Sequence, residues 1–166
     1  MATEFCFEHV FRAPSAAQIF AAFFDDGHQL EQDRQLAIAQ REVLETSDRG
    51  DVLYRKHKVT PERQLPALVK PFVSGPLHYI ESQTWTRSAD EIVWEIQPSL
   101  LSGRVRVHGS YTLASVGPAA IRRRYAGTVS VDVALLATRI ERGIVQELVR
   151  SMPIAARCTQ DWLDRT

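Results

Sequence analysis

The chain has 166 residues, of which 45% are hydrophobic and 24% charged, and its formal net charge at pH 7 is zero. This length predicts a single domain over residues 1–166 that buries roughly 70% of the surface of its unfolded chain. A chain without an excess of positive charge has no long-range attraction for nucleic acid or for an anionic membrane. We therefore exclude nucleic acid from the expected partners.

The cysteine spacing and the start of the chain indicate whether the protein binds metal, is secreted or spans a membrane. Cys6 and Cys158 lie near opposite ends of the sequence and match no metal or redox spacing, so we expect two buried thiols. The first residues lack the basic and apolar regions of a signal peptide, and no run approaches the ~18 apolar residues of a membrane span. These features predict a cytoplasmic protein that uses no metal and no cofactor.

The first part of the chain predicts one strand and two short helices. Residues 3–11 alternate, and one side carries Phe5, Phe7, His9 and Phe11, which is typical of a strand with an aromatic inner face. Residues 15–18 match a capping box, in which the hydroxyl of Ser15 accepts a backbone hydrogen bond and Gln18 reaches back. The following helix ends at the Asp-Asp-Gly of residues 25–27, and residues 28–34 form a second short helix.

Six further alternating segments predict antiparallel strands, each with one solvated face. Residues 36–45 and 52–59 form a hairpin around a turn at 46–51, and residues 77–85 and 91–97 form another. Pairing of Trp85 with Ile92 would place Glu81 and Gln83 on the inner face. Residues 104–113 and 121–133 complete the sheet, with Arg123 on the inner side of the last strand.

Residues 60–76 break this pattern with four prolines. A loop of this length in a compact domain is usually a functional lid or contains a short helix, and apolar residues at 65, 68, 69 and 72 favour the helix. An exposed apolar patch on this segment would instead suit an adaptor that binds a protein partner.

The last quarter of the chain predicts an amphipathic helix over residues 139–163. Ile144, Leu148, Met152 and Ala155 recur at helical spacing, and Thr138 with Glu141 forms a second capping box. The predicted fold class is α+β, a seven-stranded antiparallel sheet wrapped around this helix, with two short helices after the first strand. A hollow between sheet and helix is the predicted functional site.

Three stretches resemble a known superfamily. They are residues 65–72 (LPALVKPF) followed by the strand that ends at Trp85, residues 127–135 (GTVSVDVAL), and Ile140-Glu141 opening a helix that ends in residues 159–163 (TQDWL). Together with the order of elements, they resemble the START-like helix-grip superfamily (SRPBCC) of lipid-transfer domains and polyketide cyclases, in an uncharacterised bacterial branch. The resemblance implies a cavity for hydrophobic ligands between the sheet and the last helix, and it brings no established catalytic residue.

Polar residues on an apolar face are the informative candidates. We predict that the ligand contacts Phe7, His9, Arg55, His57, Phe72, Glu81, Gln83, Trp94, Tyr111, Arg123, Tyr125, Leu148 and Met152. The polar members would orient a carboxylate, hydroxyl or ketone of the ligand. Alternatively, Arg and Glu satisfy each other at the cavity rim, or the register is shifted by one residue and they face water.

Two functions follow. The first is non-catalytic binding or carriage of a small hydrophobic molecule, such as a lipid, a sterol-like compound or a polyketide. The second is a cyclase, dehydratase or hydrolase-like enzyme that uses His57 and Glu81 as acid–base residues; the sequence has no nucleophile motif or phosphate loop. The basic run 122–124 suits either transient contact with anionic lipid headgroups or a solvated strand face.

Overall fold

A computed structural model describes residues 2–62, 71 and 75–166. The strands of its sheet are β1 (Ala2–Arg12), β2 (Ile38–Arg49), β3 (Val52–Pro61), β4 (Tyr79–Thr86), β5 (Glu91–Pro98), β6 (Val105–Gly117) and β7 (Ala120–Val131). The helices are α1 (Ala16–Phe23), α2 (Asp26–Gln35) and the long α3 (Ala137–Arg165), with 3-10 turns η2 (Arg87–Ala89) and η3 (Leu101–Gly103). The predicted fold class is confirmed. The helix or lid predicted within residues 60–76, including Phe72, lies largely outside the described residues.

The sheet has seven antiparallel strands in the order β1-β7-β6-β5-β4-β3-β2. Strands β2 to β6 each pair with the next strand along the chain, whereas β1 pairs with β7. Trp85 lies opposite Ile92, which confirms the register predicted for the β4–β5 hairpin. Val105, Val107 and Tyr111 of β6 are buried, as the alternation predicted.

Several predicted boundaries were wrong, and β6 runs to Gly117 rather than ending at residue 113. The β2–β3 turn is not a loop over residues 46–51, because Thr46, Ser47 and Asp48 continue the ladder until Arg49 pairs with Val52. Their polar side chains suit turns, but at a sheet edge strand pairing satisfies their backbones equally well. The turn itself needs Gly50, whose φ of 72° lies in the left-handed region. At the other end, β7 stops at Val131 rather than at residue 133.

Neither predicted capping box forms. Ser15 is the N-cap of α1, but its side chain makes no capping hydrogen bond. Helix α3 begins two residues earlier than predicted, at Ala137, and Leu136 is its N-cap. Glu141 is 1% exposed and its carboxylate accepts a hydrogen bond from the Thr3 hydroxyl at 2.5 Å. The Glu141 side chain therefore makes a tertiary contact with β1 instead of capping its own helix.

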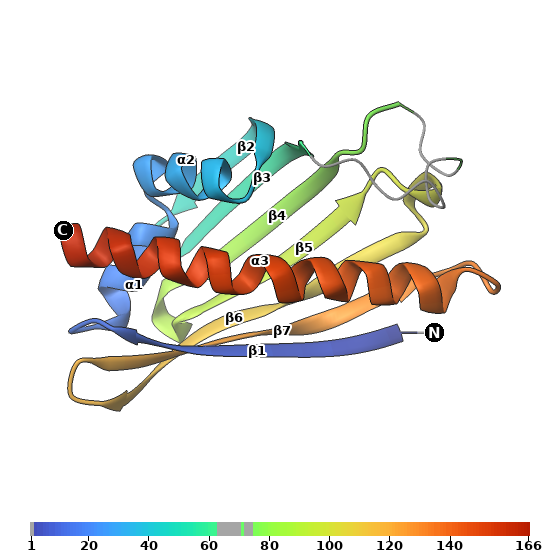
Figure 1. Cartoon of the computed structure of the whole chain (residues 1–166). Helices are drawn as coiled ribbons and strands as arrows, with labels where there is room; N and C mark the ends of the chain where they lie inside the picture. Colours follow the sequence, from blue (N-terminus) through green and yellow to red (C-terminus); the bar gives the residue numbers. More distant parts are fainter. Residues whose placement is uncertain (1, 63–70, 72–74) are drawn as a thin grey trace.

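Helix α3 crosses one face of the sheet (Figure 1). It begins near the N-terminal end of β1 and ends beside α1 and α2, which cover the other end of the same face. Core side chains such as Phe11, Ile19 and Phe20 pack between these helices and the sheet, and each stabilises the fold by about 1.5–3 kcal/mol. Cys158 of α3 is buried as predicted, but Cys6 is exposed because it points away from the inner face of β1.

Candidate ligand cavity

A cavity of about 1340 Å³ lies between the sheet and α3. Inner-face side chains of β4 to β7 form its floor, one side of α3 covers it, and α2 with the start of β2 forms a side wall. The helix contributes Ile144, Leu148 and Met152, which recur at helical spacing and therefore face the sheet together. The predicted hollow is thus present at the predicted place.

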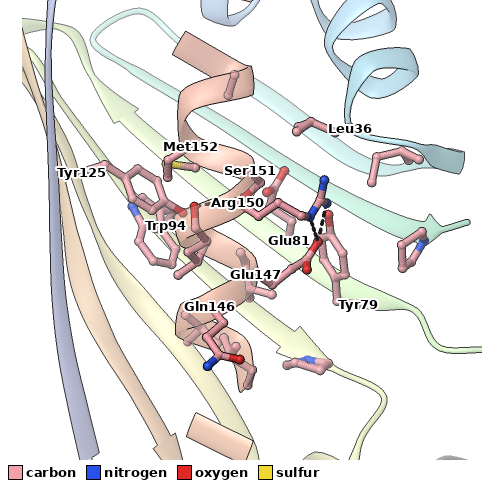
Figure 2. A pocket seen from close by; sticks show the side chains of 18 of the residues that line it. Leu36, Tyr79, Glu81, Trp94, Tyr125, Gln146, Glu147, Arg150, Ser151 and Met152 are labelled. Atoms are coloured by element: carbon pink, nitrogen blue, oxygen red, sulfur yellow. Dashed lines mark hydrogen bonds and ion pairs between the residues drawn. The ribbon is translucent and has the colours of Figure 1, made fainter. Parts of the chain in front are cut away.

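Stacked aromatic rings form the apolar floor. The Trp94 and Tyr125 rings are parallel, with centroids 4.6 Å apart and an interplanar angle of 3°, and Figure 2 shows them beside Met152 of α3. The ring of Tyr111 packs against the ring of Phe23 in α1, with centroids 5.1 Å apart. Burial raises the pKa of both tyrosines well above its ordinary value, so both are neutral phenols at pH 7. This part of the cavity offers flat, uncharged contact area.

A partly buried salt bridge forms the polar wall. Arg41 of β2 binds Asp33 of α2 through two hydrogen bonds, Nε to Oδ2 at 2.8 Å and Nη2 to Oδ1 at 2.9 Å. Its Nη1 donates to Oε1 of Glu81 at 3.2 Å. Burial lowers the pKa of Arg41, but the hydrogen bonds and negative charges of Asp33 and Glu81 outweigh burial and raise it overall. Arg41 therefore stays charged, has two carboxylate partners, and joins α2, β2 and β4.

The same network continues along the inner faces of β3 and β4. Gln83 donates to Glu81 at 3.2 Å and accepts from Nη2 of Arg55 at 2.9 Å. The Arg55 guanidinium lies 4.4 Å from the ring centroid of Phe24, in cation–π geometry. His57 lies opposite Glu81 across the β3–β4 ladder, and its Nδ1 accepts from Arg41 at 3.4 Å because arginine can only donate.

Arg123 of β7 differs from these two arginines. It is 5% exposed and lines the cavity, yet no hydrogen bond or ion pair joins it to any residue among those described. Its guanidinium lies 5.5 Å from the centroid of the Phe11 ring. Burial lowers its pKa from the ordinary value, and no carboxylate of the described residues counteracts this. Within the described part of the chain, Arg123 is therefore a buried cation without a counter-charge.

The predicted contact residues divide into three groups. Those that line the cavity are Glu81, Gln83, Trp94, Tyr111, Arg123, Tyr125, Leu148 and Met152. On the inner face, but outside this lining, are Phe7, His9, Arg55 and His57. Phe72 lies outside the described residues. Of the run 122–124, Arg122 and Arg124 are exposed on the outer face, and membrane contact through them stays a prediction.

Sequence reasoning missed Asp33 and Arg41. Register shifts interrupt β2 between Ile38 and Gln40 and again between Val43 and Glu45, so alternation could not assign Arg41 to a face. Asp33 belongs to a helix without a hydrophobic stripe, and such a sequence predicts a helix exposed to solvent on all sides. The sequence does show that Asp33 and Arg41 carry opposite charges. It does not show that the two side chains lie close together in the fold.

Mild acid is expected to destabilise the fold through two buried histidines and one half-buried histidine. Burial is the main cause that lowers the pKa of His9, His28 and His57 below 6.5, and Arg123 and Arg41 add to it at His9 and His57. The unfolded chain therefore binds more protons than the folded chain below about pH 6.5, so the free energy of unfolding falls as the pH falls. Urea unfolding from about pH 7.5 to about pH 5 measures this slope. A free energy of unfolding that stays constant over this range would contradict the prediction, and a His→Gln triple variant should flatten the slope.

Metal and membrane features were searched over the described part of the chain. There, no three His, Cys, Asp or Glu side chains come together as a metal site would require. No helix in those ranges combines the length and apolar character needed to cross a bilayer.

A protein-family model matches residues 7–163, and its description is "Protein of unknown function (DUF2505)". The chain belongs to this family. A sequence search of the curated proteins finds no match.

Solved structures place this DUF2505 chain in the START-like helix-grip fold, as predicted. The aromatase/cyclase ZhuI from Streptomyces sp. R1128 matches with a TM-score of 0.71 at 10% identity, over 99% of this chain and 95% of that one. Norcoclaurine synthase from Thalictrum flavum matches with a TM-score of 0.66 at 12% identity, over 100% of this chain and 88% of that one. Ara h 8.0201 matches with a TM-score of 0.65 at 14% identity, over the full length of both. Such low identities establish a shared fold and no shared chemistry.

Proposed function

We propose that this protein binds or carries a small hydrophobic molecule, of lipid, sterol-like or polyketide-like character, in the cavity beneath α3. The observation that carries the proposal is the cavity itself, with its volume of about 1340 Å³. Ligand pockets in proteins usually measure about 300–1000 Å³, and empty space on this scale forgoes the packing that stabilises a core. The stacked Trp94 and Tyr125 rings provide contact area for a flat or chain-like apolar body.

Acid–base catalysis by His57 and Glu81 is the alternative. In its favour, the two residues lie opposite each other on the inner face, and the lowered pKa of His57 suits a neutral base. Against it, Arg41 and Gln83 already donate to the same oxygen of Glu81, and His57 lies outside the cavity lining. A base that cannot reach the ligand has no proton to abstract. Binding without reaction is therefore the better-supported function.

Neutral dye binding tests the proposal. Nile red, which carries no charge and fluoresces in apolar surroundings, should bind with a saturable signal, and native mass spectrometry of gently purified protein should detect a bound small molecule. Leu148→Trp places a large ring in the cavity and should weaken dye binding about tenfold or more. The matched control is Val149→Trp, since Val149 is the next residue of α3 and is 56% exposed.

Two results would contradict the proposal. One is the absence of both a co-purified molecule and saturable dye binding. The other is equal weakening by Leu148→Trp and Val149→Trp, because dye on the outer surface does not distinguish the two faces of α3. Turnover of a ligand that is lost in Glu81→Gln would favour the catalytic alternative.

A further inference from the structure

Arg123 carries an unbalanced positive charge at the cavity wall. Its cross-strand neighbours are His9 on β1 and Leu113 on β6. Burial and the charge of Arg123 itself lower the pKa of His9, which is therefore neutral at pH 7. The nearby Tyr111 and Tyr125 are neutral phenols. Nothing around the guanidinium among the described residues offers a negative charge.

The other two arginines of the inner polar network do not share this lack of negative charge. Arg41 and Arg55 lie in one network with Asp33 and Glu81, in which two carboxylates balance two guanidiniums. Glu141 is a further buried carboxylate, but it contacts Thr3, six residues from His9 along β1, which corresponds to ~20 Å. That separation is too long for an ion pair with Arg123.

An uncompensated buried charge costs several kcal/mol, so an internal arginine of this kind normally has an anionic partner. Two donors near the floor also lack acceptors: Nε of Arg123 and Nε1 of Trp94 form no hydrogen bond with any described residue. Trp94 and Arg123 both line the cavity. Arg123 thus brings one positive charge to the side of the cavity formed by β5 and β7, beside flat aromatic rings.

We infer that Arg123 is the anchor for the acidic group of the ligand, and that the ligand is an amphiphilic monoanion, a hydrophobic body ending in a carboxylate. This inference rests on the proposed function and specifies its ligand class. Carboxylate oxygens match the planar N–H donors of a guanidinium, and one unbalanced positive charge suits one negative charge better than a phosphate dianion. The body of the ligand would then extend along Trp94 and Tyr125 beneath Leu148.

Matched acid and ester probes test the inference. Parinaric acid and pyrenebutyric acid are titrated beside their methyl esters, which keep the apolar body and lose the charge. The wild-type protein should bind at least one acid about tenfold or more tightly than its ester. Arg123→Met should weaken acid binding far more than ester or Nile red binding and so remove this preference, and Arg123→Lys should keep part of it. Arg124→Met is the control, because Arg124 is the next residue of β7 and faces outward.

Thermal stability separates an anchoring role from a structural one. A guanidinium without a partner costs stability in the free protein, so Arg123→Met should melt at the wild-type temperature or above it. Binding of ester and acid with equal affinity by the wild-type protein, or an acid preference that survives in Arg123→Met, would overturn the inference while Nile red binding upholds the proposed function. If neither probe nor Nile red binds, both fail together.

Discussion

Gly109→Ala is expected to prevent folding, or to lower the free energy of unfolding by more than about 4 kcal/mol. Gly109 of β6 lies opposite Gly127 of β7. A Cβ on Gly109 would lie 2.0 Å from the carbonyl oxygen of Ala126 and 2.6 Å from Cα of Gly127. These are backbone atoms of the paired strand, and they cannot withdraw without breaking the ladder. The soluble yield and the urea midpoint of the variant measure the effect.

The close approach at Gly109 also positions the site. Glycines inside strands mark places where a strand bends sharply or another backbone comes near. The β6–β7 pair carries Tyr111, Arg123 and Tyr125 beneath α3, two to four residues beyond the glycine pair. We therefore expect any rescued Gly109→Ala protein to lose dye binding as well as stability.

Gly143→Ala is the matched control for Gly109→Ala. Gly143 lies inside α3, where an added Cβ meets nothing within 4 Å. Alanine in a helix interior is about 0.5–1 kcal/mol more favourable than glycine, so this variant should gain stability. A Gly109→Ala protein that unfolds within about 1 kcal/mol of wild type would disprove the steric argument.

Asp33→Ala is expected to lower the free energy of unfolding by about 3 kcal/mol, because it leaves the partly buried guanidinium of Arg41 with one carboxylate contact instead of two. The variant removes both short hydrogen bonds of the pair, at 2.8 and 2.9 Å. For a chain of this size the loss corresponds to a fall in melting temperature of roughly 6–12 °C. Urea unfolding at neutral pH and a thermal melt measure the two quantities independently.

The control for Asp33→Ala lies in the same helix. Glu31 forms an ion pair with Arg165 whose side chains are 31% and 55% exposed, so Glu31→Ala should lower the free energy of unfolding far less than Asp33→Ala does. Adding Arg41→Leu to Asp33→Ala should recover part of the loss, because the double variant no longer buries an incompletely paired charge. Equal effects of Asp33→Ala and Glu31→Ala would mean that the Asp33–Arg41 pair is no more important than a surface pair.

Most of the fold was predictable because strand and helix periods are local properties of the sequence. Alternation gave β6 its correct inner face from Val105 to Tyr111, and the helical spacing of Ile144, Leu148 and Met152 gave α3 its correct buried side. The Trp85–Ile92 register followed from the hairpin between them. Such patterns depend on neighbours a few residues away, which the sequence places reliably.

The candidate site depended on information that is not local. Bulges in β2 hid the inward direction of Arg41, and its partner Asp33 comes from a helix with no inner stripe. Glu141 was predicted to cap its own helix, but its carboxylate instead accepts a hydrogen bond from Thr3, which is distant in sequence. Pairing across elements decides the role of each of these side chains.

The sequence by itself determined a sheet with a long helix across it, a hollow between them, and the inward direction of Glu81 and Arg123. Only the tertiary structure decided which of these charges is balanced. Glu81 is matched by Arg41, whereas Arg123 has no counter-charge among the described residues. The physical reason is that periodicity orients a side chain relative to its own strand, while an ion pair depends on the distance between atoms of different elements, which only the packed fold sets.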